Sequence, residues 1–157
     1  MIVYRLARER FKNDLSGRGA YLAGGRWNSI GIPVVYTAES RALATLEIAV
    51  HSSLNIVPDD YFLIEIEIPN DATIMVIKEA DLPLNWKSFP ETNFTQVIGD
   101  NFFKTCKDLV LKVPSAIVEG DYNLLINPLH KEFTKVSVKS VKKFEFDQRL
   151  FLKTAQA

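Results

Sequence analysis

The chain has 157 residues, a length that suits one domain and is short for two. Hydrophobic residues make up 47% of it and charged residues 24%, which is a globular composition and excludes an intrinsically disordered chain. Lysine plus arginine and aspartate plus glutamate number 19 each, so no net charge attracts a polyanion, and we expect no direct DNA binding by this chain.

Cysteine content and hydropathy indicate the compartment. Cys106 is the single cysteine, so no internal disulfide can form and a reducing environment is expected. The first residues, MIVYRLARERF, interrupt their apolar positions with arginines, unlike the apolar core of a signal peptide. No run approaches the ~20 apolar residues that are needed to span a bilayer. We therefore expect a cytoplasmic protein with no membrane contact.

The N-terminal half is expected to contain three strands and one helix. The predicted strands are Ile2–Leu6, Ile32–Thr37 and Tyr61–Ile68; a glycine-punctuated loop covers Glu9–Tyr21, and a helix runs from a cap at Ser40 or Glu39 to about Ser53. In the third strand apolar residues alternate with Glu65 and Glu67. This alternation predicts one buried face and one solvated face.

The C-terminal half is expected to be richer in strands. The predicted strands are Thr73–Ile77, Leu109–Val113, Ala116–Val118, Tyr122–Ile126 and a strand within Lys135–Phe146; a helix covers Glu91 to about Lys107, with Phe94, Val97, Ile98, Phe102 and Cys106 on its buried face. Gly99 weakens the middle of that helix. Pro114 and Pro128 mark strand ends or edges. The mixture of strands with flanking helices predicts the α+β class.

The predicted helix after Ser40 contains one unusual residue. From Ala42 to Val50 it reads ALATLEIAV, and Glu47 is the only ionisable side chain in this run. Leu43, Leu46, Val50 and Leu54 share its helical stripe, which predicts a buried face. An unpaired buried charge costs several kcal/mol, so Glu47 must be paired, protonated or used in chemistry. Two simpler explanations stay open: an ion pair with His51, or the polar edge of a half-exposed helix.

Common catalytic motifs are missing from the sequence. His51 and His130 are the only histidines, they lack metal-ligand spacing, and no metal site is expected. A serine, histidine and carboxylate triad is arithmetically possible, but no serine sits in a nucleophile-elbow motif. The segment GRGAYLAGG fits neither the Walker nor the Rossmann glycine pattern. These observations direct attention to Arg26, Tyr36, Glu47 and Ser115.

The run GGRWNSIGIPVVYTAESRALATLEIAVH, from Gly24 to His51, carries a family resemblance. Its tyrosine lies ten residues after the arginine, and its glutamate lies eleven residues after the tyrosine. This pattern resembles the core signature of RES-domain toxins. The similarity extends to Tyr4-Arg5, the GRGA segment at Gly17–Ala20, the Pro114-Ser115 step and Asn127-Pro128. It implies a RES domain over residues 1–148, followed by a loosely ordered tail over residues 149–157.

The resemblance implies a fold and an activity. The fold would be a single compact α+β domain similar to the ADP-ribosyltransferase fold of diphtheria-type toxins. The protein would be the toxin of a bacterial toxin–antitoxin pair. NAD would be its substrate, with no separate cofactor, and the nicotinamide–ribose bond would be cleaved by hydrolysis or phosphorolysis, or with transfer of ADP-ribose to a protein. An Xre-type helix-turn-helix antitoxin would cover the active site, and a homodimer within that complex is compatible with the resemblance.

Residue roles follow from the resemblance and from the chemistry of each side chain. Glu47 would stabilise the positive charge that develops on the ribose, and Arg26, with Arg5 as a second guanidinium, would bind phosphate. Tyr36 would stack on nicotinamide or hold the ribose, and Ser115 would hydrogen-bond the same part of NAD. The alternatives are structural: an Arg26–Glu47 pair, a core tyrosine, and a serine that satisfies backbone groups beside Pro114. Trp27 and Asn28 are expected to shape their loop.

Two other functional classes stay open from the sequence alone. A ribonuclease toxin would use His51, His130 and lysines of the C-terminal strands, although the neutral charge balance gives a basic groove little support. A nucleotide-binding module without catalysis would use Arg26 for phosphate and Glu47 for structure.

Overall fold

The computed structural model describes residues 1–52 and 56–151 and shows the expected α+β class. The strands are β1 (Ile2–Arg8), β2 (Val35–Ala38), β3 (Tyr61–Glu67), β4 (Ile74–Val76), β5 (Val110–Pro114), β6 (Tyr122–Ile126) and β7 (Ser137–Lys143). The α-helices are α1 (Arg18–Ala23), α2 (Arg41–His51) and α3 (Asn93–Thr105), and the short 3-10 helices are η1 (Glu9–Phe11), η2 (Glu79–Asp81), η3 (Lys131–Lys135) and η4 (Gln148–Leu150).

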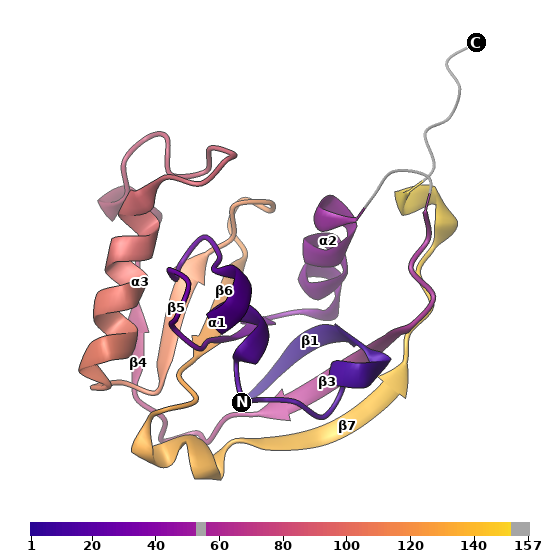
Figure 1. The fold of residues 1–157 in the computed structure, drawn as a ribbon, viewed down its shortest axis with the longest axis horizontal. Coiled ribbons are helices and arrows are strands. Elements are labelled where there is room, and N and C mark those ends of the chain that lie inside the picture. Colours follow the sequence, from indigo (N-terminus) through magenta and orange to yellow (C-terminus); the bar gives the residue numbers. More distant parts are fainter. Residues whose placement is uncertain (53–55, 152–157) are drawn as a thin grey trace.

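All seven strands belong to one mixed sheet with the order β4-β5-β6-β2-β1-β3-β7. Among the strands of the described residues, only the β4–β5 pair is parallel, and the other neighbouring strands are antiparallel. α2 lies beside β1 and β2, whereas α3 lies at the other end of the sheet beside β4 and β5 (Figure 1). The two larger helices therefore stand apart, with α3 near the β4 end of the sheet and α2 over the central strands β2 and β1.

The two faces of the sheet have separate hydrophobic cores. One face buries residues from strands across the sheet, among them Val3, Val35, Ile64, Ile66, Val110, Leu124 and Ile126. The alternation predicted for β3 is confirmed, because Ile64 and Ile66 are fully buried while Glu65 and Glu67 form ion pairs with Arg41 and Lys139. The opposite face supports α2 and the cluster under α3. Neighbouring residues of a strand therefore pack into different hydrophobic clusters on opposite faces of the sheet.

Helix α2 begins as its sequence predicts. The Ser40 hydroxyl oxygen accepts a hydrogen bond from the Leu43 amide at 3.0 Å, so serine and not Glu39 is the N-cap. Leu43 and Ala44 are buried against Ala38 of β2. The prediction that Val50 belongs to the buried stripe is wrong, since it is 55% exposed. The helix ends at His51, and the expected members Ser53 and Leu54 lie outside the described residues.

Helix α3 differs from its predicted orientation. Its buried residues are Thr95, Gly99, Phe102 and Phe103, whereas Phe94 and Val97 are 46% and 57% exposed. Gly99 explains the rotation, because an added Cβ would lie 1.7 Å from the Trp27 carbonyl oxygen. The helix therefore packs through its small residue onto the backbone of the loop before β2, and the larger apolar residues at Phe94 and Val97 lie on other faces.

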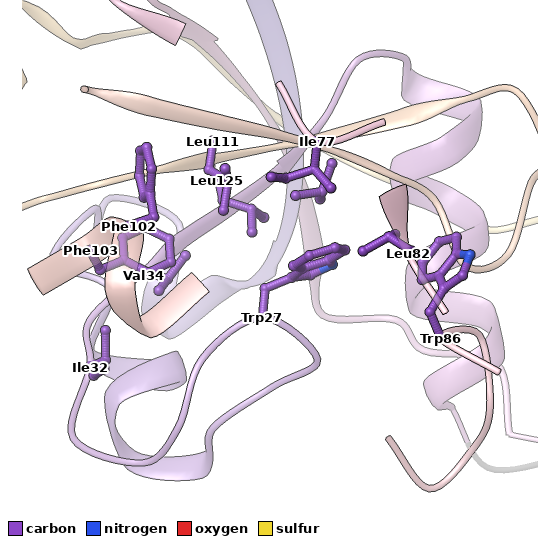
Figure 2. Close-up of a cluster of buried hydrophobic side chains, with 11 residues drawn as sticks. Trp27, Ile32, Val34, Ile77, Leu82, Trp86, Phe102, Phe103, Leu111 and Leu125 are labelled. Carbon is purple, nitrogen blue, oxygen red and sulfur yellow. The ribbon is translucent and has the colours of Figure 1, made fainter. Parts of the chain in front are cut away.

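The cluster under α3 joins segments that are distant in the sequence. It contains Trp27, Ile32, Val34, Ile77, Leu82, Trp86, Phe102, Phe103, Leu111, Val113 and Leu125. Figure 2 shows Trp27 between the strand residues and Leu82, with Trp86 beyond, and the two indole rings have centroids 6.2 Å apart. This packing holds the loop that carries Arg26 against the segment from Leu82 to Trp86.

Three further expectations need correction or extension. The predicted Glu9–Tyr21 loop contains η1 and the start of α1, which begins after Gly17 in the left-handed region (φ +73°). The predicted strand Ala116–Val118 is a bend, because the Ser115 hydroxyl oxygen accepts the amide hydrogens of Ile117 and Val118. Beyond residue 148, Arg149 and Leu150 are exposed but Phe151 is buried at 2% exposure, and residues 152–157 lie outside the description. Among the described helices, none is long and apolar enough to span a membrane.

The close approach of Gly99 to Trp27 predicts that replacing this glycine with alanine destabilises the protein, whereas the same change usually stabilises a helix. In an exposed helix Gly→Ala stabilises by about 1 kcal/mol, but Gly99→Ala must displace backbone and is expected to lower the free energy of unfolding by about 1 to 3 kcal/mol. Chemical denaturation measures the change. Gly19→Ala in α1 is the matched control, because nothing lies within 4 Å of its added Cβ. Gly99→Ala as stable as Gly19→Ala would contradict this account of the packing.

Candidate active site

A cavity of about 620 Å³ opens on the face of the sheet that carries α2. Its volume lies in the range of about 300 to 1,000 Å³ that small-molecule sites occupy. Strands β1, β2 and β6, helix α2, the Gly24–Trp27 loop and the segment from Lys87 to Glu91 all contribute to its walls. Arg26, Tyr36 and Glu47, which the sequence singles out, all line this cavity. Three of the predicted site residues therefore meet in one place.

Glu47 is a half-buried carboxylate in the cavity wall. Its Oε1 accepts a hydrogen bond of 2.6 Å from the side-chain amide of Asn123 on β6. Burial raises the pKa of Glu47 above its usual value, while the Asn123 hydrogen bond and the positive charges of His51 and Arg26 oppose that rise. Glu47 is thus not a surface residue, and within the described residues it forms no ion pair. Its one direct polar contact there is the neutral Asn123 amide, and Arg26 and His51 lie farther away.

The sheet register explains why Asn123 reaches Glu47. Ala38 of β2 pairs with Tyr4 on one side and with Asn123 on the other, so these three side chains share a face. Ala38 is small and buried, and α2 packs over it through Leu43 and Ala44. This close approach of the helix to the strand leaves Glu47 beside the neighbouring Asn123.

Tyr36 has a hydroxyl that the fold already uses. It donates to Asn28 Oδ1 at 2.8 Å and accepts from the Trp27 amide at 3.2 Å. Burial is the main cause that raises the pKa of Tyr36, and the Trp27 hydrogen bond opposes it. Gly25 must lack a side chain here, because its Cβ would lie 2.8 Å from the Tyr36 oxygen. With the hydroxyl engaged, the ring is the part of Tyr36 that can serve a ligand.

Asn28 fastens the same loop from within. It is fully buried, and its side-chain amide donates to the carbonyls of Ala20, Ser29 and Ile32. Gln96 of α3 adds a hydrogen bond of 2.9 Å to the Gly25 carbonyl. The expectation that Trp27 and Asn28 shape the loop is consistent with these contacts, although Trp27 also borders the cavity.

Arg26 connects two walls of the cavity. Its Nη1 donates to the Trp86 carbonyl at 2.7 Å and to the Ser88 carbonyl at 3.2 Å. These bonds hold the segment that brings Lys87 and Phe89 to the cavity. The Arg26–Glu47 ion pair, which was the structural alternative, is not formed among the described residues. Nη2 and Nε have no hydrogen-bond partner among the described residues, so part of the charged fork remains for a ligand.

Arg5 and Ser115 are placed differently from Glu47. Arg5 borders the cavity but pairs with Ile64, whose side chain belongs to the other face of the sheet, and its Nη1 donates to the Asp14 carbonyl at 2.8 Å. Burial lowers the pKa of Arg5, with Asp14 opposing. Ser115 is 2% exposed, and its hydroxyl oxygen caps the following bend. Pro114 and Ala116 line the cavity while Ser115 between them does not, which matches the structural alternative for this serine.

The two histidines lie in different environments. His51 is exposed at the end of α2 and lines the cavity. His130 is 5% exposed, and its Nδ1 accepts a hydrogen bond from the Glu132 amide at the start of η3. Among the described residues, no group of three histidine, cysteine or carboxylate side chains is arranged to hold a metal ion.

Sequence reasoning missed Asn123, Lys87 and Phe89 as cavity residues. Asn123 had a usable signal, because it is the one polar side chain inside the otherwise apolar run Asn123–Ile126 of a buried strand. Phe89 is 80% exposed, and neither it nor Lys87 belongs to a periodic pattern. Only the contact of their segment with Arg26 brings these two residues to the site.

Comparison with known proteins finds toxins of similar sequence and a solved structure of similar fold. The chain is 38% identical to the Prs ADP-ribosylating toxin of a Sphingobium species over 94% of its length and 92% of the relative. It is 39% identical to Toxin Res of Photorhabdus laumondii over 96% of its length and 97% of the relative. A chain in the crystal structure of the M. tuberculosis MbcT–MbcA toxin–antitoxin complex has the same fold, with a TM-score of 0.72 at 20% identity, over 96% of this chain and 86% of that one.

The sequence resemblance to one family is tested directly by a family model. The model of the RES domain matches residues 2–148, which cover every strand and helix that lines the cavity. The match also contains Arg26, Tyr36 and Glu47 together with their structural supports. On the extent of this match and on the identity to toxins of the same length, the chain belongs to the RES domain family.

Proposed function

We propose that this protein is the toxin of a toxin–antitoxin pair and that it cleaves the nicotinamide–ribose bond of NAD. The observation that carries the proposal is the Glu47 carboxylate, half-buried in a cavity of about 620 Å³ and held by Asn123. The similarity to proteins named as toxins, one of them an ADP-ribosylating toxin, supports the same conclusion. NAD acts as the substrate and no separate cofactor is required.

The chemistry of NAD cleavage suits the residues in the cavity. Nicotinamide is a cationic leaving group in NAD, so its departure needs no general acid. Positive charge then develops on the ribose in an oxocarbenium-like transition state, as in glycoside cleavage. A preorganised carboxylate stabilises that charge, and partial burial strengthens the interaction by lowering the local dielectric. Glu47 and Glu91 are carboxylates of the cavity wall, and Glu47 is the one that a hydrogen bond from Asn123 holds in place.

Arg26 and Tyr36 take supporting roles in the proposal. The free part of the Arg26 guanidinium binds the pyrophosphate of NAD, for which its planar fork is suited. The Tyr36 ring stacks on nicotinamide or ribose while its hydroxyl keeps the loop in place. Arg5 borders the cavity while its Nη1 donates to the Asp14 carbonyl, so it takes the place of a second guanidinium behind Arg26. Ser115 acts indirectly, because its hydroxyl oxygen caps the bend that follows it.

A second candidate acceptor follows from the exposure of the cavity rim. Water or phosphate can accept the ADP-ribose, but Phe89 and Val50, which line the cavity, are 80% and 55% exposed. An open apolar rim also suits contact with a protein acceptor. The Sphingobium relative is named as an ADP-ribosylating toxin. Transfer of ADP-ribose to a protein is therefore the second candidate, with the same first step at Glu47.

The proposal includes an antitoxin of the Xre helix-turn-helix type that covers the cavity. The structural neighbour was solved as a toxin–antitoxin complex, which supports an antitoxin partner for this fold. The other classes have less support. A ribonuclease that uses both histidines would need His130 in the cavity, yet it is buried as the cap of η3. A nucleotide-binding module without catalysis would give no reason for a carboxylate to be half-buried at Glu47.

Replacement of Glu47 tests the central assignment. Glu47→Gln keeps the shape of the side chain and its ability to accept from Asn123, but it removes the charge. We expect NAD consumption to fall at least about a hundredfold, by analogy with the loss of one preorganised stabilising group. Nicotinamide release by the isolated protein, with and without inorganic phosphate, measures the rate and identifies the acceptor. Glu145→Gln, at an exposed position, is the matched control. Parental turnover in Glu47→Gln would overturn the assignment.

The raised pKa of Glu47 predicts a particular pH dependence. The carboxylate is needed in its ionised form, so activity is present above the raised pKa and is lost as pH falls through it. We expect the acid limb of kcat to lie above the usual range for glutamate. A pH–rate profile from pH 4 to pH 9 measures it. A profile that stays flat down to the usual glutamate pKa would contradict the role of burial.

The same burial predicts that Glu47 lowers stability at neutral pH. Since its folded pKa is raised, the penalty for ionisation is absent below the unfolded pKa and fully present above the folded one. Glu47→Gln should therefore have a higher Tm than the parent at pH 8 and a similar Tm at pH 4. Thermal unfolding at both pH values measures this difference. A variant that is less stable by the same amount at both values would show that Glu47 serves the fold.

A further inference from the structure

We infer that Asn123 is a positioning residue, which holds one carboxylate oxygen of Glu47 so that the other oxygen is presented to the substrate. The inference rests on the proposed function and adds a residue to it. Both side chains line the cavity, and they join β6 to α2 through a hydrogen bond of 2.6 Å. The contact is therefore part of the cavity wall itself.

The direction of this hydrogen bond follows from chemistry. A carboxylate only accepts, so the amide nitrogen of Asn123 must face Oε1 whatever the other contacts of the amide are. No donor contacts Glu47 Oε2 within the described part of the chain. One oxygen is thus occupied by the protein and the other is open. A carboxylate fixed at one oxygen loses most of its rotational freedom before the substrate arrives.

The position of Asn123 is itself fixed by the sheet. Its backbone lies in register with Ala38 of β2 and Val113 of β5, so a strand on each side holds it. Glu47 stands on a helix whose first turn is packed against Ala38. Both partners are therefore on rigid elements, which is the arrangement that positions a group within a fraction of an ångström.

Asn123 is suited to this role because it is neutral. The basic side chains that face Glu47 are Arg26, from the loop before β2, and His51, from its own helix. Tyr36 of β2 and Glu91 are other titratable groups that line the same cavity. A cation in place of Asn123 would form an ion pair and reduce the charge that is available to the ribose. An amide orients the carboxylate and leaves its full charge for the transition state.

Two substitutions at Asn123 test the inference by kinetics. Asn123→Ala removes the donor, and Asn123→Asp keeps the shape but replaces the donor with an acceptor. We expect kcat for nicotinamide release to fall about tenfold or more in Asn123→Ala and further in Asn123→Asp, with KM nearly unchanged. The acid limb of kcat should move to higher pH in both, because loss of a donated hydrogen bond favours the protonated carboxyl. Asn101→Ala and Asn101→Asp, at an exposed position of α3, are the matched controls.

A second measurement does not depend on activity. The carboxyl carbon of Glu47 is followed by NMR during a pH titration and is identified by the signal missing from Glu47→Gln. Its midpoint should rise in Asn123→Ala and rise more in Asn123→Asp, in protein whose thermal unfolding remains cooperative. If the parent protein released no nicotinamide, the proposed function would fail while this titration still tested the contact.

Three outcomes would overturn the inference. An unchanged kcat in Asn123→Ala would show that Glu47 needs no support from this residue. A large rise in KM with parental kcat would assign Asn123 to substrate binding instead. A fall in kcat without any movement of the acid limb or of the Glu47 midpoint would assign the loss to packing.

Discussion

The site depends on one interaction between a charge and its surroundings. Glu47 is placed where burial disfavours its ionised form, and the neutral Asn123 donor, together with the nearby basic side chains His51 and Arg26, offsets part of that cost. A carboxylate in water would interact weakly with a transient positive charge, because solvent screens it. In the proposed reaction, the same residue at the wall of a cavity would interact more strongly with that charge, at the cost of its burial. The remaining elements of the site serve to maintain this arrangement.

The site also requires the loop before β2 to keep its conformation, and contacts on several sides hold this loop in place. Asn28 and the Tyr36 hydroxyl hold it from within, Gln96 and Gly99 of α3 hold it from the outside, and Trp27 packs against Trp86 (Figure 2). Arg26 extends the attachment to the Trp86 and Ser88 carbonyls. A guanidinium that binds two backbone carbonyls is preorganised for a further anion at its free edge. The hydrophobic cluster and the loop that presents Arg26 to the cavity are thus parts of one structure.

The two faces of the sheet differ, because one carries a hydrophobic core and the other carries the cavity. The face with Val3, Ile64 and Ile66 is closed and apolar, as a core that stabilises a domain of this size. The opposite face carries α2 and α3 apart from one another (Figure 1), and the cavity lies on this face with α2 in one wall and the Gly24–Trp27 loop, which α3 supports, in another. Because strand residues alternate between faces, adjacent positions such as Arg5 and Leu6 have unrelated roles. This alternation explains why the Arg5 guanidinium donates a hydrogen bond to the Asp14 carbonyl, although Arg5 also borders the cavity.

Local sequence patterns alone predicted several features of this protein. The alternation in β3, the Ser40 cap of α2 and the anomalous acid at Glu47 are each visible in a few consecutive residues, because strand and helix periodicity and capping are local effects. The spacing of Arg26, Tyr36 and Glu47 indicated the RES family before the fold was known, and the family match bears this out. Tertiary structure alone decided which face of α3 is buried, since that depends on how closely Gly99 approaches Trp27. It also decided that Asn123 meets Glu47, because that contact joins residues from separate elements whose register no local pattern encodes. The contacts of Ser115 with the Ile117 and Val118 amides are local, and the sequence analysis kept them open as the structural alternative for this serine.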